Sequence, residues 1–157
     1  MLKEIAPAVT RAAIVSNPKT VPYDCFLHGA ESAAPSLGLQ IVPGRVENTA
    51  DIERTIESLA QVPDGGMILP PDTTTVVNRD LIIALAAKHR LPAIYSLRIF
   101  VAGGGLMSYG TDFVNLFRQS ASYVDRILRG AKPGDLPVQQ PPSLKRPSIL
   151  KRPKHSA

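Results

Sequence analysis

The stretch GMILPPDTTTVVNRDLIIALAAKHRLPAIYS, residues 66–96, decides the fold. It opens with a short apolar run at residues 66–69, which predicts a buried strand. Residues 76–89 carry apolar side chains at helical spacing, and residues 92–95 are a second short apolar run. A strand, a helix and a strand joined by short connections predict a β-α-β unit, in which the two strands lie parallel.

The same alternation continues on both sides of this unit. Further strands are expected at residues 12–16, at 40–46 and, more weakly, at 106–108. Further helices are expected at residues 23–37, after Asn48 and after Asp112. The strand runs are continuously apolar, which is typical of a sheet covered on both faces. The sequence therefore predicts an α/β fold: a parallel sheet of about five strands with helices on both faces.

Composition divides the chain of 157 residues into one domain, residues 1–140, and a tail, residues 141–157. The tail is rich in Pro, Lys and Arg, cannot bury a core, and is expected to be disordered. It holds five basic residues and no acidic one. Of the 18 Lys and Arg residues in the chain, 13 therefore remain in the body, where they balance 13 Asp and Glu. The basic excess lies in the tail, so no nucleic-acid-binding domain is expected.

Several other classes of protein and site are not indicated. No apolar stretch is long enough to span a bilayer, and no secretory signal is recognisable, so the chain as written would stay in the cytoplasm. Cys25 is the single cysteine, which excludes an internal disulfide, and it is expected to be a small buried hydrophobe. The three histidines lack metal-ligand spacing, and the glycines at 103–105 match no phosphate-binding pattern. We expect no metal, no cofactor and no catalytic residue.

The polar residues that follow the predicted strands are the candidate site, because ligands of open parallel sheets bind beyond the carboxyl ends of the strands. These residues are Asn17, Asp72, Thr73, Tyr95, Ser96 and Tyr109. They suit a small ligand that is oriented by hydrogen bonds and covered by an aromatic ring. Two alternatives remain open: that these groups only cap turns and helices, or that Asp72 and Tyr95 serve a small α/β enzyme.

Three segments carry a resemblance to a known family. They are LKEIAPAVTRAAIVSNP at residues 2–18, LIIALAAKHRLPAIYS at 81–96 after the Pro-Pro-Asp turn, and GGLMSYGTDFVNLFRQSASYVDRILRGAKPGDLPV at 104–138. Over about residues 2–140 the chain resembles the ABC-transporter substrate-binding proteins of the tryptophan/tyrosine type. The combination of LPAIY, GGLMSYG and YVDRILRGAKPGDLPV is specific enough to indicate that family.

The resemblance implies one lobe of a type I periplasmic-binding-protein fold, mainly the second, with the first lobe and the export signal absent. It implies a periplasmic protein that captures a small solute for an ABC permease and catalyses nothing, or a truncated remnant of one. By position, ligand contacts would come from Asn17, Asp72, Thr73, Tyr95 and Ser96, with Tyr109 at the hinge. An amino-acid-like ligand is expected, with Asp72 facing its ammonium and Tyr95 against an apolar side chain.

A second function class is also compatible with the sequence. The chain could be a stand-alone α/β interaction module that has lost solute binding. Such a module would form a homodimer through the apolar face of the last helix, formed by Phe113, Leu116, Phe117 and Val124.

Overall fold

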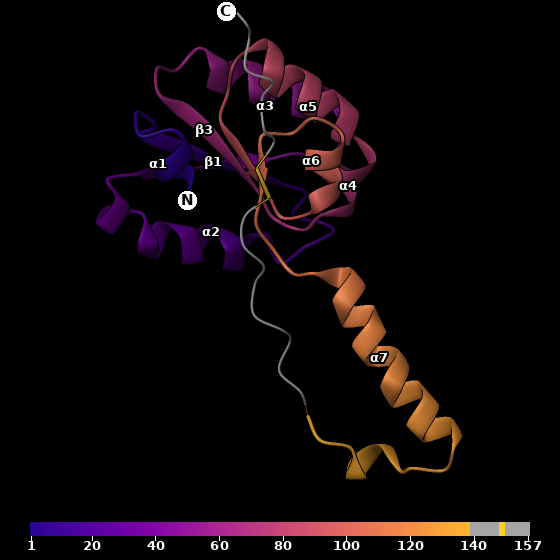
Figure 1. Ribbon diagram of the computed structural model, residues 1–157. Helices are drawn as coiled ribbons and strands as arrows, with labels where there is room; N and C mark the ends of the chain where they lie inside the picture. The colour runs from indigo at the N-terminus through magenta and orange to yellow at the C-terminus, as the bar shows by residue number, and fades with distance from the viewer. Residues whose placement is uncertain (139–147, 150–157) are drawn as a thin grey trace, which may run out of the picture.

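A computed structural model describes residues 1–138 and 148–149 (Figure 1). Their strands form one sheet in the order β2-β1-β3-β4-β5-β6. The bounds are Arg11–Ser16 (β1), Gln40–Arg45 (β2), Gly65–Leu69 (β3), Ala93–Tyr95 (β4), Met107–Ser108 (β5) and Ser148–Ile149 (β6). The first five are parallel, and β6 pairs antiparallel with β5. The predicted parallel sheet of five strands is confirmed.

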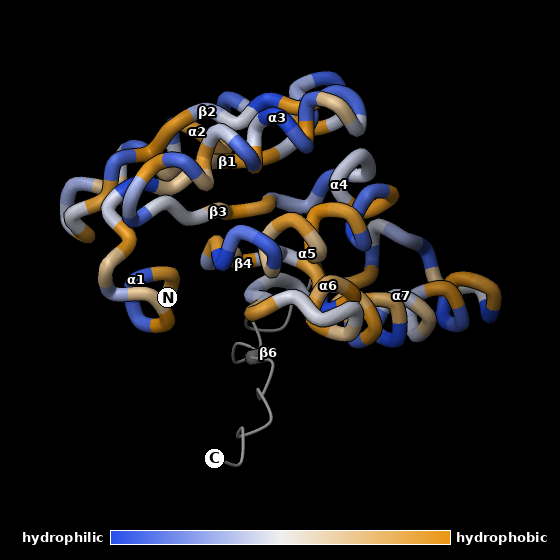
Figure 2. The backbone as a smooth tube through the Cα atoms, turned by 90° about the horizontal axis from the view of Figure 1, so that it is seen from above, coloured by the Kyte–Doolittle hydropathy of each residue, from blue (hydrophilic) through white to orange (hydrophobic). Residues whose placement is uncertain are grey.

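Helices cover both faces of the sheet, as predicted (Figures 1 and 2). Their bounds are Leu2–Ile5 (α1), Tyr23–Ala33 (α2), Thr49–Ala60 (α3), Thr73–Val77 (α4), Arg79–Lys88 (α5), Arg98–Ala102 (α6) and Phe113–Leu128 (α7), with 3-10 turns at Pro35–Leu37 and Pro133–Asp135. The α-helix predicted at 23–37 ends at Ala33, where Pro35, which has no backbone N–H, begins the 3-10 turn. The helix predicted at 76–89 is two helices separated by Asn78.

The core is thicker on the α3, α5 and α6 side of the sheet. There Met67 and Leu69 of the central strand β3 are fully buried. On the α1 and α2 side, Ile68 of the same strand and Ile94 of β4 are only partly buried. The strand order explains the difference, because the connection from β1 to β2 is the only one among the five parallel strands that runs toward the β2 edge of the sheet. The right-handed crossovers toward β5 therefore place their helices on the other face.

Tyr23 fastens α2 to the edge of the sheet. Its hydroxyl donates to the Ile14 carbonyl at 2.9 Å and accepts from the Gly44 N–H at 2.9 Å. Burial raises the pKa of this phenol above its usual value. Pro43 and Gly44 predicted an edge or bulged strand. β2 is the edge strand, and it pairs with β1 from Gln40 to Arg45.

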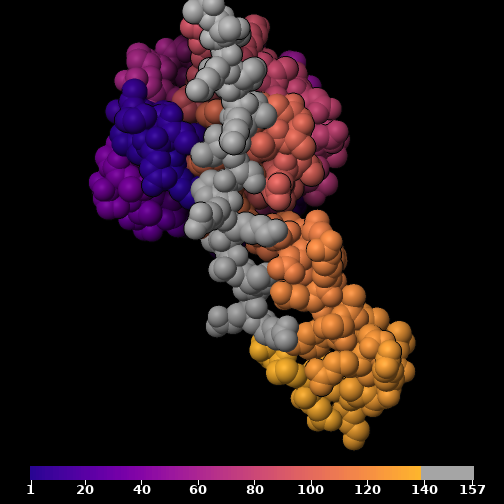
Figure 3. Space-filling model, in the orientation of Figure 1, coloured from indigo at the N-terminus to yellow at the C-terminus, as the bar shows by residue number. Residues whose placement is uncertain are grey.

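α7 runs away from the sheet and buries none of its residues (Figures 1 and 3). The segment after it folds back, and the Tyr123 hydroxyl donates to the Pro137 carbonyl at 2.6 Å. The tail predicted at 141–157 lies outside the described residues, apart from β6. The prediction for Cys25 was wrong: its side chain is exposed on α2, because the buried positions of that helix are Tyr23 and Leu27.

Candidate functional site

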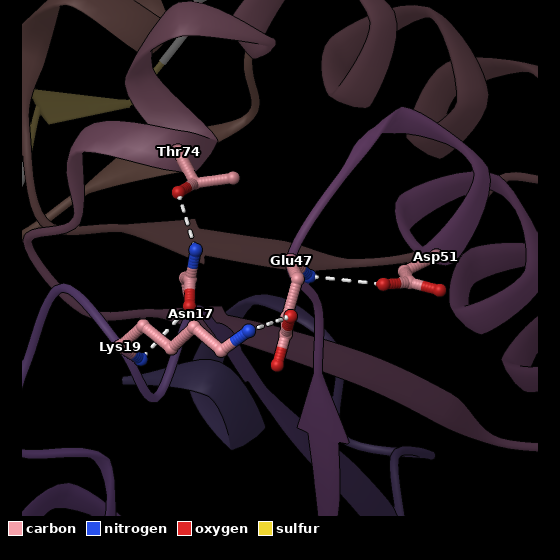
Figure 4. Close-up of polar contacts among 5 residues, drawn as sticks. All are labelled: Asn17, Lys19, Glu47, Asp51 and Thr74. Atoms are coloured by element: carbon pink, nitrogen blue, oxygen red, sulfur yellow. Dashed lines mark hydrogen bonds and ion pairs between the residues drawn. The ribbon is translucent and has the colours of Figure 1, made fainter.

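The adjacent strands β1 and β3 bring Asn17 and Asp72 together at their carboxyl ends. The Asn17 backbone N–H donates to Asp72 Oδ2 at 3.3 Å. The Asn17 side-chain amide donates to Thr74 Oγ1 at 2.9 Å, across the gap between the two loops (Figure 4). Asn17 is 6% exposed and Asp72 is 4% exposed. The two strand ends are therefore joined into one buried polar cluster.

Asp72 is the acceptor at the centre of this cluster. As the N-cap of α4 it accepts from the backbone N–H groups of Thr74 at 3.3 Å and Thr75 at 3.0 Å. It also accepts from the Asn17 N–H and from the Thr20 hydroxyl. A carboxylate offers about four acceptor positions, so protein donors occupy all of them. Among the described residues no cation pairs with Asp72.

A second layer ties the loop after β1 to the loop after β2. The Lys19 N–H donates to Asn17 Oδ1 at 2.8 Å, and Lys19 Nζ pairs with Glu47 Oε2 at 2.5 Å (Figure 4). The Glu47 N–H donates to Asp51 Oδ2 at 3.1 Å. That bond, helped by Arg54, holds the pKa of the Asp51 carboxyl below its usual value. The positive charge of Lys19 therefore pairs with Glu47, at the periphery of the polar cluster, and not with Asp72.

Beside the polar cluster, on the α2 side of the sheet, is a small apolar pocket of about 270 Å³. Its walls include Ser96 and Tyr109, which follow β4 and β5, together with apolar side chains from β1, α2, β3 and β4. These apolar residues include Ile14, Phe26, Ile68 and Ile94. The pocket continues to Pro70 and Pro71, directly before Asp72, so it opens at the same edge of the sheet as the polar cluster.

The structure brings five of the six predicted site residues to this edge. Asn17 and Asp72 are bonded, Ser96 and Tyr109 share the apolar pocket, and Thr73 is exposed at the start of α4. Tyr95 lies elsewhere. Its ring is 1% exposed and stacks on Phe100 of α6, with ring centroids 4.6 Å apart. Burial raises the pKa of Tyr95 to about 12.

Thr20, Thr74 and Phe26 belong to the site but were not predicted. The sequence carried a signal for the two threonines, since each lies within three residues of a predicted site residue that follows a strand. It carried none for Phe26, because only the tertiary packing of α2 brings that ring to the pocket.

Metal clusters and membrane-spanning helices are both missing from the described part of the chain. There, no three His, Cys, Asp or Glu side chains gather where they could hold a metal ion. In the same residues, no helix combines the length and the apolar composition that crossing a membrane requires.

The chain matches one protein family in sequence and several solved structures in fold. A family model described as "ABC transporter substrate binding protein" matches residues 1–147. Among solved structures, a conserved domain protein from Vibrio cholerae O1 biovar El Tor is 26% identical with a TM-score of 0.75. That match covers 91% of this chain and 49% of the other. Among curated proteins no sequence matches.

Two other solved structures have the same fold. One is an ABC domain in complex with L-Trp from Streptococcus pneumoniae. It is 22% identical with a TM-score of 0.79, covering 94% of this chain and 51% of the other. The second is a ligand-free, open substrate-binding protein with adhesive properties from Clostridium difficile. It is 18% identical with a TM-score of 0.70, covering 98% and 55%. This chain spans about half the length of each of these three structures.

Proposed function

The chain belongs to the ABC transporter substrate-binding protein family, a family of non-enzymatic binding proteins, and from this premise we propose that it captures a small amino-acid-like solute. The solute lies at the carboxyl ends of the strands, between the polar cluster around Asp72 and the apolar pocket beside it. In this proposal the chain is the solute-binding lobe of an ABC importer. An ABC permease as partner and a periplasmic location are part of the same proposal, and the family match supports them.

The buried charge of Asp72 is the observation that carries the proposal. Its carboxylate has neutral donors only and no cation partner among the described residues. A buried negative charge left without a counter-ion attracts a positive group of the ligand. Since its own acceptor positions are filled, Asp72 acts on an ammonium through its charge and through the Thr and Asn groups that it orients.

The remaining residues of the site contact two different parts of the solute, a polar end and an apolar side chain. The Asn17 amide has one N–H and one acceptor position left after its bonds to Thr74 and Lys19. With the exposed Thr73 hydroxyl it binds the polar end of the solute. Ser96 and Tyr109 border the apolar pocket, which receives the side chain of the solute. Tyr95 positions Ser96 from within the core.

Calorimetric titration with L-tryptophan tests this assignment. Phe26 is 36% exposed and lines the apolar pocket, so Phe26→Ala removes solute contacts at little cost to the core. We expect this substitution to weaken binding about tenfold, since about 1.5 kcal/mol of apolar burial is lost. The matched control is Phe117→Ala on α7, which lies outside the pocket. Equal affinity of Phe26→Ala and the wild type would exclude the pocket as the solute site.

A second candidate function rests on α7. In the apolar face formed by Phe113, Leu116, Phe117 and Val124, Leu116 is partly buried and the other three side chains are exposed. A cavity of about 470 Å³ opens between α7 and the returning segment at 133–138. We propose that a second copy of the chain covers this face, in a symmetric pair that buries the same helix from each copy.

Light scattering across a concentration series tests the pairing. We expect a homodimer for the wild type and a monomer for Phe117→Glu, because the introduced charge would be buried in the interface. Arg118→Glu changes the charge of an adjacent exposed position and serves as the control. A wild-type chain that stays monomeric at every concentration would rule out the homodimer.

A further inference from the structure

A second cavity, of about 450 Å³, lies at the opposite edge of the sheet from the proposed solute site. It is bounded by the end of α5, by the start of β4 at Pro92 and Ala93, and by the turn at Gly104 and Gly105. These are amino ends of strands, whereas the proposed solute site lies at the carboxyl ends. The volume is in the range of about 300–1,000 Å³ that small-molecule sites occupy.

Tyr95 gives this cavity a hydrogen-bond donor. The ring lines the cavity and is fixed by its stack on Phe100 and by Gly105, where an added Cβ would lie 2.7 Å from the ring. Among the described residues nothing forms a hydrogen bond with the hydroxyl, although Tyr95 is 1% exposed. The hydroxyl is not one of the fully enclosed side-chain atoms that lack a partner, so it keeps a small exposed area where an acceptor from outside the chain can reach it.

Arg90 gives the same cavity a positive charge. It follows α5 with a φ of 54° and lines the cavity, but its side chain is exposed. Within the described part of the chain its guanidinium forms no ion pair. The wall also includes the apolar side chains of Ile83, Ala86 and Leu91. A donor, a cation and an apolar wall together suit a small carboxylate with a hydrocarbon body.

We propose that this cavity is a second ligand site, which binds a small apolar carboxylate independently of the solute site. The carboxylate oxygens accept a hydrogen bond from the Tyr95 hydroxyl and pair with the Arg90 guanidinium. The hydrocarbon part packs against α5. Ligand in this cavity stabilises the lobe, because it binds the folded chain and not the unfolded one.

Hexanoate is the probe, with hexanol and hexylamine as controls that lack the negative charge. We expect hexanoate to bind the wild-type chain more tightly than either control in calorimetric titration. Tyr95→Phe keeps the ring and removes the hydroxyl, and Arg90→Gln removes the charge. Each should weaken hexanoate binding about tenfold or more. Arg79→Gln, at the other end of α5, and Phe26→Ala, at the solute site, should leave it unchanged.

The same variant gives a test without ligand. Because the Tyr95 hydroxyl is unpaired, Tyr95→Phe should have a Tm equal to or above that of the wild type. A Tm several degrees lower would mean that the hydroxyl already has a partner, and would overturn the proposal. Hexanoate binding that is absent, equal to that of hexanol, or insensitive to both Tyr95→Phe and Arg90→Gln would overturn it as well.

Discussion

Asp72→Ala is expected to lower the free energy of unfolding by about 3 kcal/mol. The substitution removes the cap of α4 and leaves four donors without their acceptor, at a position that is almost fully buried. Loss of a helix cap alone costs about 1 kcal/mol, and loss of a bond to a buried charge costs about 1.5–3 kcal/mol. Urea unfolding, followed by far-UV circular dichroism, measures the change.

Two further variants make the Asp72 experiment specific. Asp72→Asn keeps the shape of the side chain and one good acceptor, so its loss of stability should be intermediate. Asp125→Ala removes an exposed carboxylate that pairs with Arg129 on α7, and should change the free energy of unfolding by less than about 0.5 kcal/mol. If Asp72→Ala matched Asp125→Ala, the polar cluster would not hold the two strand ends together.

Gly110→Ala is expected to destabilise the chain by about 3 kcal/mol or more. An added Cβ at this position would lie 2.1 Å from the Ser96 carbonyl oxygen, so the backbone itself must move. The contact lies where β4 and β5 end, next to the bond from the Tyr109 N–H to the Tyr95 carbonyl at 2.8 Å. The displacement should therefore also separate Ser96 from Tyr109 in the apolar pocket.

Gly29→Ala is the matched control for this substitution. Gly29 lies inside α2, where an added Cβ would have no atom within 4 Å, and Ala is the better helix former by about 1 kcal/mol. It should raise the free energy of unfolding while Gly110→Ala lowers it. Equal stability of the two variants would show that β4 and β5 do not approach as closely as this geometry requires.

Much of the fold could be predicted because the strands are short apolar runs bounded by turn signals. Residues 12–16, 40–46 and 66–69 correspond to β1, β2 and β3 within one residue at each end. α1 and α6 were not predicted, since helices of four or five residues have too few turns to show a helical period. The exposure of α7 was expected only for the interaction module that pairs through this helix, because an apolar face indicates burial without indicating the partner.

Part of the candidate site was predictable for a related reason. Asn17 and Asp72 follow neighbouring parallel strands, whose carboxyl ends meet at one edge of the sheet. The position of Tyr95 depends on which face its strand presents. Ala93 and Tyr95 point toward the α5 and α6 side, whereas Ile94 points toward the α1 and α2 side. Alternate residues of a strand point to opposite faces of the sheet. Which of the two faces Tyr95 occupies depends on the topology of the whole sheet, and a strand of three residues does not reveal it.

The most direct test of solute capture is an ¹⁵N chemical-shift titration of the chain with L-tryptophan up to its solubility limit. The proposal predicts shifts that saturate at the backbone amides of Asn17, Thr73, Ser96 and Tyr109, while the amides of α7 stay in place. Phe26→Ala should move the midpoint of the titration to higher concentration. An unchanged spectrum, or shifts confined to α7 or to the cavity beside Arg90, would contradict the assignment of the solute site to the carboxyl ends of the strands.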